Sequence, residues 1–75
     1  MVNDQERAEI SEAAASFLEA GIQCFERGDF NRAQVLLDAA EKLYRKTNDE
    51  LSLAVVRVWH DSLQRCVAPS HLDHR

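Results

Sequence analysis

The sequence predicts an all-α fold of three antiparallel helices. Apolar or small residues recur in steps of three and four along three segments, and residues that cap or end helices stand between these segments. With 75 residues, of which 45% are hydrophobic and 29% charged, the chain is near the lower size limit for a single core. We expect one three-helix domain over 1–69 and a flexible tail over 70–75, because the tail shows no periodicity.

The first helix is expected to run from Asn3, as its N-cap, to about Arg27. Glu6 stands three residues after Asn3 and completes a capping box. Gly21 lies in the middle of this helix, where glycine costs about 1 kcal/mol relative to alanine. We expect a close approach of the next helix to compensate, with the small Ala33 and Ala40 opposite. The predicted apolar stripe consists of Ile10, Ala14, Phe17, Gly21 and Cys24.

A tight turn at Gly28 and Asp29 leads into the second helix, expected from about Asn31 to Lys46. Gly28 can adopt a positive φ that ends the first helix, and Asp29 is a good N-cap for the second. So short a connection forces the two helices to lie antiparallel with their stripes facing each other. The second stripe consists of Ala33, Leu36, Leu37, Ala40, Leu43 and Tyr44.

The third helix is expected from about Leu51 to Val67, with either Thr47 or Asn48 as its cap. Pro69 disfavours helix in the residue before it and so sets the end of this helix.

The hairpin resembles a tetratricopeptide repeat (TPR), a helix-turn-helix unit of about 34 residues. The matching residues are Phe17, Ala20 and Gly21, then Gly28, Asp29 and Phe30 at the turn, then Ala33, Leu37 and Ala40. Cys24 replaces the usual aromatic residue, and the closing proline is absent. The family's period carries the first-helix pattern onto Leu51, Ala54, Val55 and Val58. The resemblance therefore implies a TPR-like helical hairpin with a C-terminal capping helix, which corresponds to the first helix of a second repeat without its partner.

Composition excludes several classes of function. No apolar run approaches the length of a membrane span, and no basic-then-apolar secretion signal is present, so we expect a cytoplasmic protein without a membrane partner. Acidic residues outnumber basic ones over 1–30, which disfavours binding to nucleic acid. Cys24 and Cys66 are expected to be reduced, buried thiols.

No motif indicates catalysis, and we expect neither an enzyme nor a cofactor. The chain has no Gly-rich phosphate loop, no Gly-x-Ser-x-Gly and no His-Glu-x-x-His. Residue types that bind metals occur near the C-terminus, but a flexible tail supplies no organised second shell, so no metal site is expected there. These residues are His60, Cys66, His71, Asp73 and His74.

The first and third helices carry more apolar surface than one shared core needs. Leu18, Ile22 and Phe25 form a second row on the first helix, and Val56 and Trp59 widen the apolar arc of the third. In the TPR resemblance, the row on the first helix lies on the concave side, where peptides or partner helices dock. These five residues are the expected anchors of a protein–protein interaction module that forms a homodimer or docks a partner helix.

Three alternatives remain open at this point. The two surplus rows could pack on each other within one chain. In its Gly28-Asp29-Phe30 turn, its Tyr44 and its three-helix length, the chain also resembles a microtubule-interacting-and-trafficking (MIT) domain, a family that grips a partner's amphipathic helix between its later helices. A metal- or redox-responsive regulator could instead use Cys24, Cys66 and the tail histidines.

Overall fold

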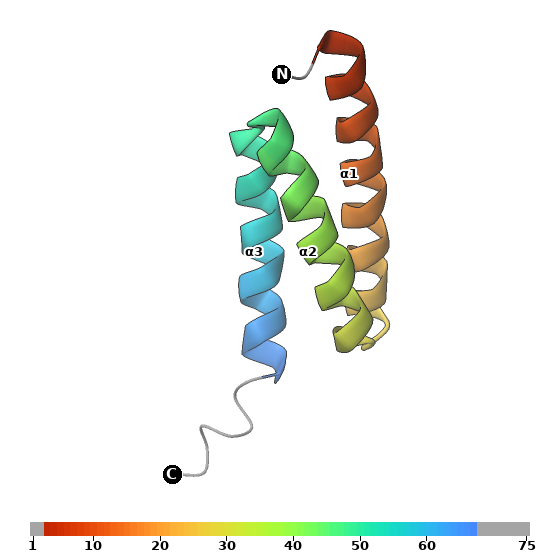
Figure 1. The fold of residues 1–75 in the computed structure, drawn as a ribbon. Helices are drawn as coiled ribbons and strands as arrows, with labels where there is room; N and C mark the ends of the chain where they lie inside the picture. Colours follow the sequence, from red (N-terminus) through yellow and green to blue (C-terminus); the bar gives the residue numbers. More distant parts are fainter. Residues whose placement is uncertain (1–2, 68–75) are drawn as a thin grey trace.

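A computed structural model describes residues 3–67, which form three α-helices (Figure 1). Helix α1 spans Asp4–Glu26, α2 spans Phe30–Thr47 and α3 spans Glu50–Val67. The chain reverses direction at each turn, so α1 and α3 run the same way with the antiparallel α2 packed between them. The all-α, three-helix prediction is confirmed, with each helix boundary within about one residue of its expected place. The expected tail over 70–75 lies outside the described residues.

Helix α1 begins and ends at the residues that the sequence predicts. Asn3 Oδ1 accepts a hydrogen bond from the Glu6 amide at 2.7 Å, and Glu6 Oε1 accepts one from the Asn3 amide at 3.3 Å, which completes the capping box. At the other end Gly28 has φ +87°. The Gly28 amide donates to the carbonyl of Phe25, and the Asp29 amide donates to that of Cys24. This is a Schellman motif, in which the glycine takes the left-handed position.

The turn between α2 and α3 differs from the prediction, because the cap of α3 is Asp49. Asn48 adopts a left-handed conformation (φ 57°) that ends α2. Asp49 then accepts hydrogen bonds from the amide and the hydroxyl of Ser52, at 3.2 and 2.8 Å. The Thr47 side chain is buried and donates to the Tyr44 carbonyl. Neither Thr47 nor Asn48 can therefore cap α3, since both complete α2.

The core lies along α2, because this helix has a neighbour on two sides. Its buried apolar residues come from all three helices: Ala14 and Cys24 of α1, Ala33, Leu37, Ala40 and Tyr44 of α2, and Leu53, Val56 and Leu63 of α3. The predicted stripes of α1 and α2 therefore do face each other.

Gly21 is buried where α1 meets α2. A Cβ at this position would lie 3.2 Å from Leu37 Cγ and 3.3 Å from Leu36 Cβ. The expected close approach is present, but the side chains nearest to the glycine are two leucines and not Ala33 or Ala40. The glycine makes room for leucines, which bury more apolar surface than alanines do.

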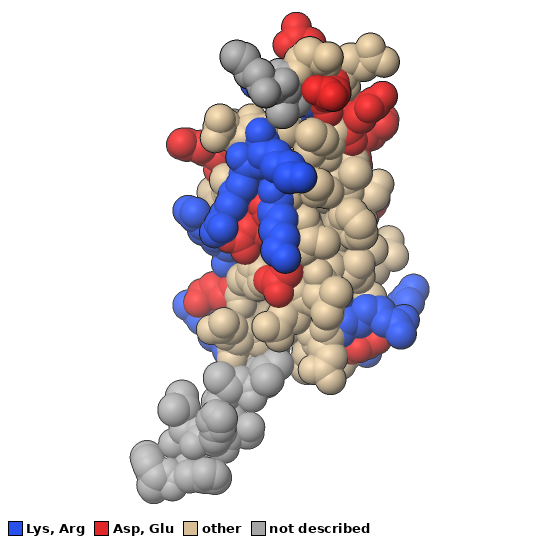
Figure 2. Space-filling model, in the orientation of Figure 1, with Lys and Arg blue, Asp and Glu red and all other residues tan. Residues whose placement is uncertain are grey.

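Charged side chains are unevenly placed on the surface. Figure 2 shows basic side chains gathered near the C-terminal end of α2, where Arg45 and Lys46 lie, and acidic ones near the start of α1, where Asp4 and Glu6 lie. Each group has the sign that stabilises its helix end. None of the helices within residues 3–67 combines the length and the apolar character that crossing a membrane requires.

Candidate functional site

Helix α3 presents a row of exposed apolar side chains, Leu51, Val55 and Val58, which we call the α3 row. Their exposed fractions are 83%, 44% and 64%. Steps of four and three place them on one side of the helix, opposite to the buried Leu53, Val56 and Leu63. Large apolar side chains that gather on one helix face, rather than standing singly, indicate an interaction surface.

The corresponding positions of α1 are largely covered. If the TPR period of about 34 residues is applied to the α3 row, the corresponding residues of α1 are Phe17, Gly21 and Cys24. Gly21 and Cys24 are buried, and Gly21 faces α2, whereas Phe17 is partly exposed. Two of the three corresponding positions on α1 are therefore buried, whereas all three residues of the α3 row are exposed among the described residues 3–67.

One flank of the α3 row is a shallow hollow of about 400 Å³, lined by Glu50, Leu53, Ala54 and Arg57. Glu50 and Arg57 carry opposite charges on this flank. Charged residues of both signs beside the α3 row can form ion pairs with charged residues of a docked helix. Such pairs would select the register of that helix more than they would add affinity.

The expected anchors on α1 pack partly within the chain. Leu18 and Phe25 lie against the core, and Ile22 is half-buried. The Phe25 ring centroid lies 5.5 Å from that of Phe30 and 5.6 Å from that of Trp59, the latter edge-on. Both distances are typical of favourable aromatic pairs. The surplus rows of α1 and α3 therefore meet at Phe25 and Trp59, as one of the three alternatives anticipated.

Val56 is not part of any accessible surface, which corrects its expected role as an anchor. It is completely buried, because the register of α3 turns it toward α2 together with Leu53 and Leu63. The residues that sequence reasoning left out of the anchor set are Leu51, Val55 and Val58. The sequence signal that could have found them is their own spacing of four and three residues along α3.

The two cysteines have different environments. Cys24 is buried in the core as expected, whereas Cys66 is exposed, so the expectation that Cys66 is buried is wrong. Both are free thiols. Cys66 lies on α3 eight residues after Val58, close to the limit of the described residues.

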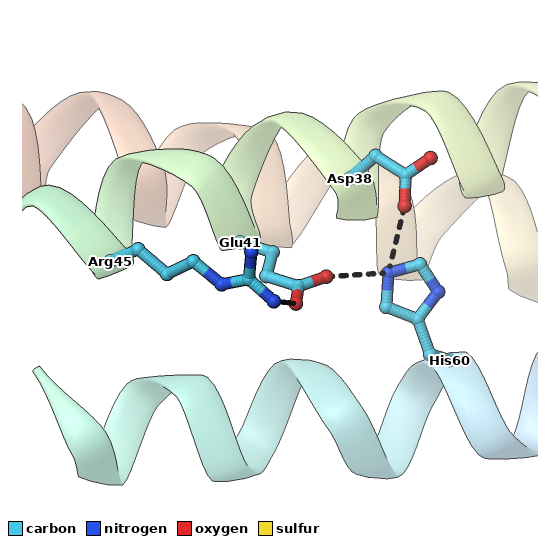
Figure 3. A network of polar contacts seen from close by, with 4 residues as sticks. All are labelled: Asp38, Glu41, Arg45 and His60. Atoms are coloured by element: carbon cyan, nitrogen blue, oxygen red, sulfur yellow. Dashed lines mark hydrogen bonds and ion pairs between the residues drawn. The ribbon is translucent and has the colours of Figure 1, made fainter.

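A separate polar cluster joins α2 to α3 (Figure 3). His60 Nε2 lies 3.2 Å from Asp38 Oδ1 and 3.6 Å from Glu41 Oε1. The other oxygen of Glu41 pairs with Arg45 Nη2 at 2.7 Å. Within residues 3–67, Asp38, Glu41 and His60 are the group whose ligand atoms converge closely enough to share a metal ion.

Comparison with known proteins gives no relative, since no family model, curated protein or solved structure matches the chain. The α3 row and the polar cluster are therefore the features of the molecule that bear on its function.

Proposed function

We propose that this chain is a non-catalytic protein–protein interaction module whose α3 row packs against an amphipathic helix. In this proposal, α1 and α2 form a TPR-like repeat, and α3 is the first helix of a second repeat. The observation that carries the proposal is the exposure of Leu51, Val55 and Val58 on α3. The middle residue, Val55, corresponds to Gly21 of α1, which is buried against α2. A docked helix would take the place on α3 that α2 takes on α1.

The simplest occupant is the α3 row of a second copy. The row is close to symmetric about Val55, with Leu51 four residues before it and Val58 three residues after it. Two copies paired antiparallel about a two-fold axis near Val55 would therefore set Leu51 of each against Val58 of the other. Such an isologous contact is the commonest arrangement in homodimers.

The magnitudes of burial and of association cost are compatible with a weak dimer. Fully burying one large apolar side chain contributes about 1.5–3 kcal/mol, so six of them contribute at most about 9–18 kcal/mol, and less where they are already half-covered. Association costs about 4–15 kcal/mol in lost translational and rotational freedom. The difference ranges from no net association to about 14 kcal/mol, and this range includes the value of about 8 kcal/mol that a micromolar dissociation constant needs.

The test is sedimentation equilibrium of the full chain over a wide concentration range. The wild type is expected to rise from 8.5 kDa toward twice that mass at micromolar concentration and above. Val58→Glu is expected to remain at the monomer mass with unchanged helical content by circular dichroism, because the new charge would be stranded in the interface.

Val35→Glu provides a matched control. Val35 lies on α2 and is 66% exposed, against 64% for Val58, but it is not in the α3 row. This variant is expected to associate as the wild type does. A wild type that stays monomeric throughout would refute self-association. Equal dissociation by both variants would show that added charge, and not the α3 row, is responsible.

A further inference from the structure

The polar cluster of Asp38, Glu41 and His60 contains a nitrogen atom whose hydrogen bonding is incomplete. His60 Nε2 is buried and has no hydrogen-bond partner, although Asp38 Oδ1 is only 3.2 Å away. The contact is short enough for a hydrogen bond and therefore lacks the required alignment. A buried polar atom without a partner costs about 1–3 kcal/mol. Such an atom in a native structure needs an explanation, and a bound ion is one of them.

The geometry points to a binding site for a divalent transition-metal ion, of which Zn²⁺ is the representative, held by His60 Nε2, Asp38 and Glu41. An ion bound to the imidazole lies on the lone-pair axis of Nε2, and its other ligands stand to the side of that axis. The Asp38 oxygen, which is close to Nε2 but badly aligned for a hydrogen bond, has this arrangement. This site lies between α2 and α3 and does not depend on the α3 row.

The distances agree with the size of a zinc site. Zinc lies about 2.0–2.2 Å from nitrogen and oxygen ligands, so neighbouring ligand atoms in a tetrahedral site are about 3.3–3.6 Å apart. The two distances from His60 Nε2 are 3.2 and 3.6 Å. All three ligand atoms lie within 4.8 Å of one another, and rotation of the half-exposed Asp38 side chain can close the remaining gap.

The local sequence and the surroundings hold these ligands in place. Asp38 and Glu41 are three residues apart on α2 and therefore lie side by side on one face, with His60 of α3 opposite (Figure 3). Arg45 holds Glu41 Oε2 at 2.7 Å, which leaves Oε1 directed to His60. A partner that orients a ligating carboxylate in this way strengthens a metal site, and its loss typically costs 10- to 100-fold in affinity.

The ligand set selects the kind of metal. Imidazole favours zinc, copper, nickel and iron over magnesium and calcium, which prefer oxygen ligands alone. Two carboxylates balance the charge of a divalent ion, and the three protein ligands leave at least one position for water. The bound ion would fasten α3 to α2 at a point midway along both helices.

The experiment compares the thermal unfolding midpoint of the full chain, freed of metal with a chelator, with and without one equivalent of Zn²⁺. Zinc is expected to raise the midpoint of the wild type, because a ligand that binds only the folded state stabilises it. Mg²⁺ at the same concentration is expected to have no effect. Asp38→Asn removes a ligand charge from a half-exposed position and is expected to weaken zinc binding tenfold or more while the metal-free midpoint stays close to that of wild type.

Two further variants separate this site from other metal-binding groups. His60→Gln is expected to lose the zinc effect, whereas the double variant His71→Gln/His74→Gln is expected to keep it. Titration with Co²⁺ is a second readout, and its visible absorption should show binding at one equivalent without a thiolate charge-transfer band. Absence of any zinc effect on the wild type would overturn the proposal. So would an undiminished effect in Asp38→Asn and His60→Gln, or its loss in the tail double variant.

Discussion

Gly21→Ala tests how closely α1 and α2 are packed. The added Cβ would lie 3.2 Å from both Cγ and Cδ2 of Leu37 and 3.3 Å from Cβ of Leu36. These separations are a few tenths of an ångström shorter than favourable contacts between carbon atoms, so one neighbour has to move. Leu37 is completely buried, and because protein interiors are closely packed we expect little free space for it to move into.

Two effects of opposite sign decide the outcome. Alanine stabilises a helix interior by about 1 kcal/mol relative to glycine. Forcing an extra carbon into a well-packed core costs about 1–3 kcal/mol. Because Leu37 is fully enclosed, we expect the packing cost to exceed the helix gain, with a net loss of about 1 kcal/mol. For a domain of this size, that loss corresponds to a fall of about 4–8 °C in Tm.

The assay is urea unfolding followed by circular dichroism, with an osmolyte present in every sample so that weakened variants stay folded. In the Leu37→Ala background, which lacks Cγ and Cδ2, Gly21→Ala is expected to become stabilising. Leu36→Ala is the control, because it keeps the Cβ that faces Gly21, so the sign should not change there. If Gly21→Ala stabilises the wild type by the full 1 kcal/mol, Leu37 moves aside and the reasoning is refuted.

Three further substitutions test the hairpin and the helix ends. Ala40→Leu adds volume at a completely buried site and is expected to cost about 1–3 kcal/mol; a urea midpoint equal to that of wild type would contradict the facing of the two stripes. Asp49→Ala removes both hydrogen bonds to Ser52 and is expected to cost about 1 kcal/mol, whereas Asp49→Asn should retain most of the stability. Gly28→Ala is expected to cost about 1–2 kcal/mol through backbone conformation alone, since no atom beyond the two neighbouring residues lies within 4 Å of the added Cβ. A smaller cost for Gly28→Asn, measured in the same urea titrations, would support that cause.

The helices, their caps and the first turn follow from residues close together in the chain. The Asn3–Glu6 capping box, the left-handed Gly28 and the Asp29 cap each depend on atoms a few residues apart. Local hydrogen bonds and backbone preferences act before any tertiary contact forms, so the sequence shows them directly. The misassigned cap of α3 fits this account, because Asn48 and Asp49 are both good capping residues by composition alone.

The surfaces depend on how α3 is rotated and offset against α2, which no local pattern specifies. That rotation buries Val56, leaves Leu51 exposed and brings Trp59 to Phe25. The apolar arc of α3 is wide enough to allow several such rotations, since a helix hides only about one stripe against a single neighbour.

The polar cluster shows the same distinction most clearly. Asp38 and Glu41 are one turn apart on α2, so their common face can be read from the sequence. His60 stands far from them in the chain and reaches them only through the packing of α3 on α2. The pairing of residues on neighbouring helices is set by side-chain interlocking along their whole contact, and it therefore appears only once the helices are packed.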